Sequence, residues 1–229
     1  MRGFLVLLIC LFIVSSNLLA QIGNINDVSG TPLKSKEEEN IEGSQYLFNG
    51  DWTKGKIEIG SNTEIEDVPI RYNSFKDHVE ILKSNGDILK VDIYSVNGFT
   101  YERLTPEGNI YKYEFENVKD KFKDSKYNKN FLRLIYDGKF KLYMDHKVIM
   151  QKVAPPTYGG AKVTKFIPQE TLFMVNNNKV YRLKLSRRAF KKAFPSLKNK
   201  IKDYDKRFDI DYENEVDLIK LCEFINEEI

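Results

Sequence analysis

Three short turn sequences, each flanked by residues that alternate between apolar and polar, constrain the fold of this chain more than any other feature. Asn85-Gly86 lies in HVEILKSNGDILKVDI, Asp137-Gly138 in FLRLIYDGKFKLYM, and Asn176 to Asn178 in TLFMVNNNKVYRLKL. Asn-Gly between alternating segments is the strongest short hairpin signal, because both turn residues must reach positive φ. The sequence therefore predicts antiparallel pairing of successive strands.

The same rhythm runs from about Tyr46 to Leu185, and KIEIGSNTEIEDVPIRY shows it with Gly60, Ser61 and Asn62 between two alternating runs. Repeated hairpins with short loops predict an antiparallel β meander that is closed or partly closed on itself. Lys and Glu residues on the opposite face of each strand are typical of the solvated side of such a sheet.

After Leu185 the hydrophobic period changes to that of helices. Ser186 is a good N-cap before Phe190 and Phe194, and Pro195 interrupts the helix or starts the next one. Two further apolar stripes follow at helical spacing, and the last helix is expected to begin near Asp211 or Asn214. The predicted fold class is α+β, a β meander (44–185) followed by a C-terminal group of three short helices (186–229).

The N-terminus has the layout of a secretory signal peptide. Arg2 precedes an apolar run from Phe4 to Val14, and a small residue, Ala20, is followed by Gln21. A membrane anchor is the alternative, but the run of about 11 residues is shorter than the roughly 20 that a spanning helix needs. We therefore expect residues 1–20 to be removed, with no transmembrane segment afterwards, residues 21–43 to form a flexible leader, and residues 44–229 to form a single domain.

Removal of the signal peptide leaves 35 basic and 33 acidic residues and one cysteine, Cys222. One cysteine cannot crosslink its own chain, so stability in an oxidising compartment must come from a packed core, and Cys222 is expected to pack as a buried thiol. The localisation expected from export is periplasmic, cell-surface or extracellular.

The stretch RRAFKKAFPSLKNKIK (187–202) carries seven positive charges and no negative one, whereas residues 203–229 carry ten acids and three bases. Nucleic-acid binding needs a net positive field and several phosphate contacts, and the mature chain is nearly neutral. We therefore expect the basic charges to be a solvated face that complements the acidic segment, with no nucleic-acid partner.

No motif of a known catalytic or metal site occurs in the chain: it has no GxSxG, HExxH, P-loop, GxGxxG or Cys/His ligand spacing. The two histidines, His78 and His146, each follow an aspartate, but neighbours on a strand point to opposite faces, so neither dipeptide forms an acid-base pair. The sequence thus predicts no catalytic residue, no metal and no cofactor. The alternative is an envelope hydrolase that uses His146 or His78 with a carboxylate from another strand.

Four aromatic residues are candidates for contact with a ligand or partner. Tyr158 lies between Pro155-Pro156 and Gly159-Gly160 in the long loop 153–170, which is either functional or disordered. Trp52 is the only tryptophan, and Tyr111 and Tyr113 alternate in NIYKYEFEN. For all three, packing in the core or at the sheet edge is the competing interpretation.

The order of these features resembles a group of small exported proteins of unknown function from Bacteroidota-type bacteria. The resemblance rests on the signal peptide before Gln21 and on YLFNGDWTKGKIEI, EIEDVPIRYN, KLSRRAFKKAF and EVDLIKLCEFINEE, and it covers most of residues 44–229. It implies export and the β-then-α layout, and it implies no catalytic or binding residue. The expected function is a non-catalytic binding or structural domain of the cell envelope, with an envelope component, a protein or a small apolar ligand as its partner.

Overall fold

The computed structural model of the chain describes residue 25 and residues 28–33, 41–60, 63–104, 108–123, 127–154 and 162–229. The predicted signal peptide, most of the predicted leader and the candidate contact residue Tyr158 lie outside these residues. Export and a role of Tyr158 therefore stay predictions.

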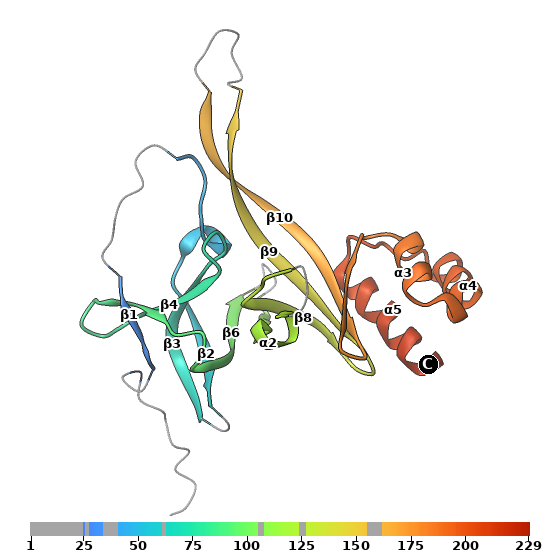
Figure 1. Cartoon of the computed structure of the whole chain (residues 1–229), viewed down its shortest axis with the longest axis horizontal. Helices are drawn as coiled ribbons and strands as arrows, with labels where there is room; N and C mark the ends of the chain where they lie inside the picture. The colour runs from blue at the N-terminus through green and yellow to red at the C-terminus, as the bar shows by residue number, and fades with distance from the viewer. Residues whose placement is uncertain are drawn as a thin grey trace, which may run out of the picture.

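The described chain is an α+β fold with one large antiparallel sheet followed by three C-terminal helices (Figure 1). The sheet has 11 strands in the order β1-β5-β4-β3-β2-β6-β7-β8-β9-β10-β11. The strands are β1 (Gly30–Pro32), β2 (Thr53–Ile59), β3 (Thr63–Asn73), β4 (His78–Leu82), β5 (Ile88–Val91), β6 (Val96–Leu104), β7 (Ile110–Asn117), β8 (Phe131–Asp137), β9 (Lys141–Val153), β10 (Val163–Asn176) and β11 (Lys179–Leu183).

Most neighbours in the sheet are consecutive in sequence, as in a meander, with exceptions at the β1–β5 and β2–β6 pairs. The sheet is open, because its order ends at β1 on one side and at β11 on the other. This corrects the closed form of the expected closed or partly closed sheet. The sheet can stay open because its two halves cover different cores, so closure is not needed to bury its apolar face.

The three predicted hairpins are present, but their turns differ. Asn177 and Asn178 both have positive φ (49° and 61°) between β10 and β11, as a two-residue turn requires. Between β4 and β5 only Gly86 has positive φ (88°), and the Lys83 carbonyl accepts a hydrogen bond from the Gly86 amide. The expectation of two positive-φ residues was therefore wrong at Asn85-Gly86, because the Lys83–Asp87 pair closes a wider loop.

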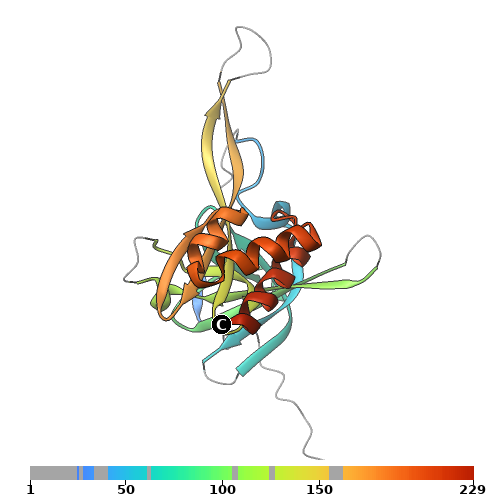
Figure 2. The ribbon, with the colours of Figure 1, turned by 90° about the vertical axis from the view of Figure 1, so that its right-hand side faces the viewer.

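The C-terminal helices are α3 (Arg187–Ala193), α4 (Lys198–Phe208) and α5 (Glu215–Glu228), with a short 3-10 turn, η4 (Pro195–Leu197), after α3. Asn214 caps α5, since its side chain accepts hydrogen bonds from the amides of Val216 and Asp217. Ser186 occupies the N-cap position of α3 without a side-chain cap bond. Figure 2 shows the three helices gathered on one side of the molecule. A further short helix, α2 (Lys119–Phe122), follows β7.

Two large apolar cores lie at the two ends of the sheet. The first is built on β2 to β7 and includes Ile57, Phe99 and Phe115. The second lies between β8–β11 and the three helices, and includes Leu142, Phe190 and Cys222. Cys222 is fully buried there, and burial raises the pKa of its thiol to about 12. The helices therefore cover one face of the second half of the sheet only.

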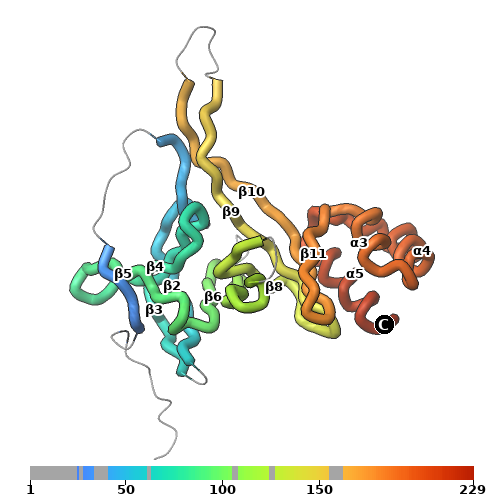
Figure 3. Tube along the Cα trace, in the orientation of Figure 1, coloured from blue at the N-terminus to red at the C-terminus, as the bar shows by residue number. Residues whose placement is uncertain are grey.

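Part of the predicted leader differs from expectation, because residues 30–32 form the edge strand β1 against β5 and Val28 is buried in the first core. Further along, Glu42 makes a parallel bridge to Lys165 of β10. The segment from residue 41 thus runs beside the long β9–β10 hairpin before it enters β2 (Figure 3).

The basic stretch makes intramolecular ion pairs with acids of the following helices: Arg187 with Asp205, and Lys200 with Glu228. Among the described residues, no helix has the length and apolar character needed to cross a membrane.

Candidate functional site

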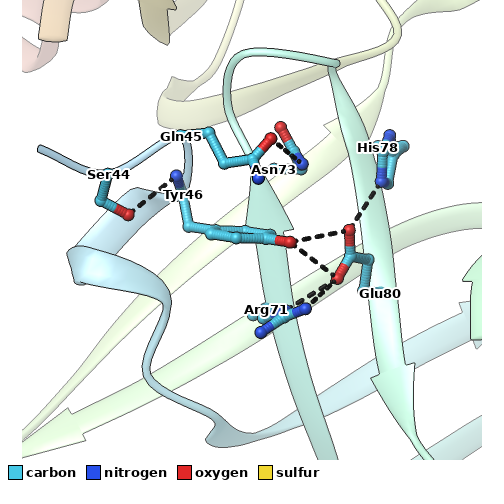
Figure 4. A network of polar contacts seen from close by, with 7 residues as sticks. All are labelled: Ser44, Gln45, Tyr46, Arg71, Asn73, His78 and Glu80. Carbon is cyan, nitrogen blue, oxygen red and sulfur yellow. Dashed lines mark hydrogen bonds and ion pairs between the residues drawn. The ribbon is translucent and has the colours of Figure 1, made fainter. Parts of the chain in front are cut away.

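A buried carboxylate, Glu80, is the centre of a polar network at the junction of β3, β4 and the segment before β2 (Figure 4). Its Oε1 lies 2.8 Å from Nε2 of His78. Its Oε2 accepts a hydrogen bond from Nε of Arg71 at 2.7 Å and forms an ion pair with an NH2 nitrogen of Arg71, also at 2.7 Å. The Tyr46 hydroxyl lies 3.3 Å from both oxygens. Burial alone would raise the pKa of Glu80, but the bonds from His78 and Arg71 outweigh it and lower that pKa.

Arg71 is held between two aromatic rings. Its guanidinium carbon lies 4.2 Å from the centre of the Tyr46 ring and 4.3 Å from that of Trp52. These two cation–π contacts restrain the guanidinium while its nitrogens bond to Glu80. The structure therefore places the candidate contact residue Trp52, which is half-buried, as one wall of this cation site.

Gln45 and Asn73 extend the network, since the Asn73 side chain donates to Gln45 Oε1 at 3.0 Å. Tyr46 and Asn73 also form an antiparallel bridge. These contacts bind the 44–50 segment to the end of β3 and so hold the segment in position.

A pocket of about 300 Å³ lies between the 43–49 segment, the turn after β3 and the base of the β9–β10 hairpin. Apolar side chains form much of its wall: Leu47, Phe48, Val148, Phe166 and Pro168. Its polar lining includes Ser44, Tyr46, Ser74, His146 and Glu170. We call this space the arm-base pocket, where the arm is the long β9–β10 hairpin.

One wall of the arm-base pocket has unusual backbone geometry. Phe48 and Asn49, within the 3-10 turn η3 (Leu47–Gly50), have φ of 54° and 61°. Positive φ in a bulky residue such as Phe is costly, and such strain persists only where the surroundings hold it. Here the Phe48 ring packs 5.0 Å from the Tyr113 ring and under Arg103, which keeps the turn in place.

His146 and Glu170 are directly paired across β9 and β10 inside this pocket. Nδ1 of His146 lies 3.0 Å from Oε1 of Glu170. This bond lowers the pKa of Glu170 against the opposing effect of its burial. A carboxylate on Nδ1 favours the tautomer with its proton there, which leaves Nε2 as an acceptor.

Two residues that line the arm-base pocket each carry a buried polar atom without a hydrogen-bond partner: Nε2 of His146 and Oγ of Ser74. Ser74 is 3% exposed, and its carbonyl accepts a hydrogen bond from the amide of Val148, two residues after His146. An unpaired buried polar atom costs free energy, and a ligand that supplies the missing bonds recovers it.

A second hollow, of about 450 Å³, lies on the other side of the network. His78 lines it together with Asp77, Lys90 and Asn130. The carboxylate that contacts His78 comes from its own strand β4, two residues along, whereas the partner of His146 comes from a neighbouring strand. Glu80 thus links His78 in this second hollow to Tyr46 at the wall of the arm-base pocket.

Tyr111 and Tyr113 lie on β7 and stack beside Arg133, whose guanidinium carbon is 4.1 Å from the Tyr113 ring. An NH2 nitrogen of Arg133 donates to Glu215 of α5 at 2.6 Å and to the Tyr111 hydroxyl at 3.0 Å. Tyr113 reaches the arm-base pocket only through Phe48, and Tyr111 lies farther along the same stack. The structure thus relates these two tyrosines to the pocket indirectly.

Sequence reasoning missed Ser74, Glu80, Glu170 and Phe48. A local signal for the contact between His78 and Glu80 was present, because their spacing in HVE places both side chains on one face of the strand. The pairing of His146 with Glu170 depends on the register of two long strands and has no local signal. Among the described residues, no group of three or more His, Cys, Asp or Glu side chains could hold a metal ion.

No family model, curated protein or solved structure matches this chain.

Proposed function

We propose that this protein is an exported binding domain of the cell envelope that takes a small ligand in the arm-base pocket. The ligand has an apolar body, which contacts Phe48, Val148 and Phe166, and a polar end group, which bonds to Ser74 and His146. This end group donates a hydrogen bond to the free nitrogen of His146, which is an acceptor. It can also accept a hydrogen bond from Oγ of Ser74, because a serine hydroxyl both donates and accepts.

The observation that carries this proposal is the pair of unpartnered polar atoms on two residues that line a pocket with several apolar side chains in its wall. Small-molecule sites combine an apolar lining with a few polar groups that orient the ligand, and about 300 Å³ is at the lower end of their usual range. The strained turn at Phe48 and Asn49 supports the same proposal, since strain of this kind concentrates at ligand sites.

Export and an envelope location are part of the proposal and rest on the N-terminal sequence and the stated resemblance. One cysteine in the mature chain and two large apolar cores are compatible with folding in an oxidising compartment.

Thermal unfolding of the purified protein against a ligand panel tests the proposal. The panel contains short and long fatty acids, haem, peptidoglycan fragments, glycans and divalent metals. A ligand at about 100 times its Kd adds roughly 2.7 kcal/mol and raises the midpoint by a few degrees. Val148→Phe should fill the pocket and abolish the shift, whereas Ile149→Phe adds bulk to the opposite face of β9 and should preserve it.

A shift that survives Val148→Phe would place the ligand elsewhere and contradict the proposal. A flat panel, together with a cooperative unfolding transition, would favour a protein partner in place of a small ligand.

A second candidate function, a hydrolase of the envelope, is favoured by one specific observation. His146 lies in a concave site and is oriented by a carboxylate from another strand, Glu170, with its second nitrogen free. This is the arrangement of a general base held by an orienting acid. It is tested by hydrolysis of simple ester substrates by wild type and by His146→Ala.

A further inference from the structure

We propose that Ser74 is a nucleophile that forms an acyl intermediate, with His146 as its general base and Glu170 as the group that orients His146. This inference rests on the second candidate function, because it assigns the attacking group and the substrate class of that same site. The substrate is a small ester of an aliphatic carboxylic acid.

The geometry of the pocket carries the inference. Oγ of Ser74 and Nε2 of His146 are both buried, both without a hydrogen-bond partner, and on residues that line the same space. The bond from the Val148 amide to the Ser74 carbonyl, at 3.3 Å, fastens the serine beside the strand that carries His146. Residues 146 and 148 are two apart on β9 and therefore project to the same face.

The orienting group is in place on the far side of the imidazole. Oε1 of Glu170 receives the Nδ1 proton at 3.0 Å, so the lone pair of Nε2 is available to a proton donor. Ser74 and His146 are not bonded to each other, and nucleophile–base bonds often tighten only when substrate binds. Nucleophile, base and orienting acid are the three parts of the serine triad, which recurs on unrelated folds and in any chain order.

The apolar wall selects the substrate class. Leu47, Phe48 and Phe166 line the space next to Ser74 and His146 and give an acyl chain an apolar environment. No lysine or arginine other than Lys147 is among the described lining residues, so an anionic acyl group has little to bind. A neutral ester with a short aliphatic acyl chain fits this lining best.

The reaction balances without a further reagent. The Oγ lone pair forms a bond to the ester carbonyl carbon, the Oγ proton moves to Nε2, and the carbonyl π pair moves to its oxygen. The carbonyl re-forms as the C–O bond to the alcohol breaks, and the alcohol leaves with the proton from Nε2. Water then attacks the acyl carbon, Nε2 takes a water proton and returns it to Oγ, and the carboxylic acid is released.

The test uses an alkyl fluorophosphonate, which phosphonylates activated serines, with the site read by peptide mass mapping, and p-nitrophenyl butyrate as the ester. We expect labelling at Ser74 and none in Ser74→Ala. His146→Ala should slow labelling about 100-fold or more, because a general base contributes about that much. Ser95→Ala is the matched control, since Ser95 does not line the arm-base pocket and its Oγ donates to the Asp92 carbonyl.

A second variant guards against loss of folding in Ser74→Ala. Ser74→Cys should react with iodoacetamide faster than the fully buried Cys222 does, and this reaction should slow when His146 is also replaced by Ala. Equal reaction rates with and without His146 would overturn the assignment.

The outcomes separate this inference from the function on which it rests. Ester hydrolysis that requires His146 but persists in Ser74→Ala, without a label on Ser74, would keep the hydrolase and overturn the serine nucleophile. Neither hydrolysis nor labelling, in a protein that binds ligands in the arm-base pocket, would overturn both and leave the binding function.

Discussion

The Glu80 carboxylate and the Arg71 guanidinium form a buried ion pair in which both donor nitrogens, Nε and one NH2, lie 2.7 Å from the same oxygen, Oε2. The other oxygen is thereby left to His78, at 2.8 Å. One carboxylate thus anchors a cation stacked between Tyr46 and Trp52 on one side and orients an imidazole on the other. The pair organises the wall of the arm-base pocket, because Tyr46 belongs to both.

Glu80→Gln should destabilise the protein by about 3 kcal/mol, since it leaves the Arg71 charge in a mostly buried site without its counterion. Urea unfolding at neutral pH measures the change as a lower midpoint with an unchanged slope. The expected loss of stability is large because the ion pair is buried: the Glu80 side chain is only 2% exposed.

Asp67→Asn is the matched control for that prediction. Asp67 pairs with Lys54 at 3.2 Å on the surface, where both side chains are more than 70% exposed, and Asn tolerates the positive φ of position 67. Its effect should stay below about 0.5 kcal/mol. Equal effects of the two substitutions would contradict the role given to the Arg71–Glu80 pair.

The sequence predicted the β-then-α layout and the hairpins because these depend on local signals. Asn177 and Asn178 reach positive φ as their residue types allow, and Asn214 caps the last helix. The sequence did not predict the open sheet or the pairing of β1 with β5, because each depends on contacts between strands far apart in the chain.

The candidate site was harder to predict than the fold for the same reason. His146 and Glu170 are brought together by the register of β9 and β10, and Ser74 by a backbone bond to Val148. The candidate aromatic residues Trp52, Tyr111 and Tyr113 each stack on an arginine, and no local sequence signal predicts these contacts.

Glu116 should make stability fall steeply in acid. Burial would raise its pKa, but hydrogen bonds from Lys121, Lys141 and Tyr143 outweigh burial and lower it to about 2. The folded-state pKa lies below the ordinary value of 4.5, so this stabilisation is present above about pH 4.5 and is lost as pH falls towards 2. It amounts to about 3 kcal/mol, at 1.36 kcal/mol for each pKa unit.

Urea unfolding of wild type and Glu116→Gln between about pH 2 and pH 6 checks this prediction, because the folded and the ordinary pKa of Glu116 both lie in this range. The difference in unfolding free energy between the two proteins should shrink as the pH is lowered. A difference that stays constant over this range would mean that Glu116 does not titrate with a lowered pKa.

Glu215 should control the ionisation of Tyr111. Burial and the hydrogen bond to Glu215 raise the pKa of the Tyr111 hydroxyl to about 12. Glu215→Gln removes the negative charge and leaves Arg133 beside the phenol, so the pKa of Tyr111 should fall towards its ordinary value of 10. Ultraviolet absorbance of tyrosinate during alkaline titration, with Tyr111→Phe as the baseline, measures the shift.

Asp217→Asn is the control for this prediction, because Asp217 lies in the same first turn of α5 but contacts Lys220 and the Asp211 amide instead of Tyr111. It should leave the titration of Tyr111 unchanged. An equal shift in both variants would mean that the helix as a whole, and not the Glu215 carboxylate, sets the pKa of Tyr111.

Cys222 should report on the unfolding of the helical end of the molecule. Its side chain is fully buried among Leu218, Leu221 and Ile225, and the raised pKa of about 12 keeps it as the thiol at neutral pH. Since only the thiolate reacts with disulfide reagents, labelling of the native protein should be slow and should accelerate with urea in step with the loss of helical circular dichroism. Cys222→Ser should cost about 2 kcal/mol, because it places a hydroxyl in an apolar environment, whereas Cys222→Ala should cost less. Rapid labelling without denaturant would contradict the packing of α5 onto β8–β11, because the thiol would then have to be open to solvent in the native state.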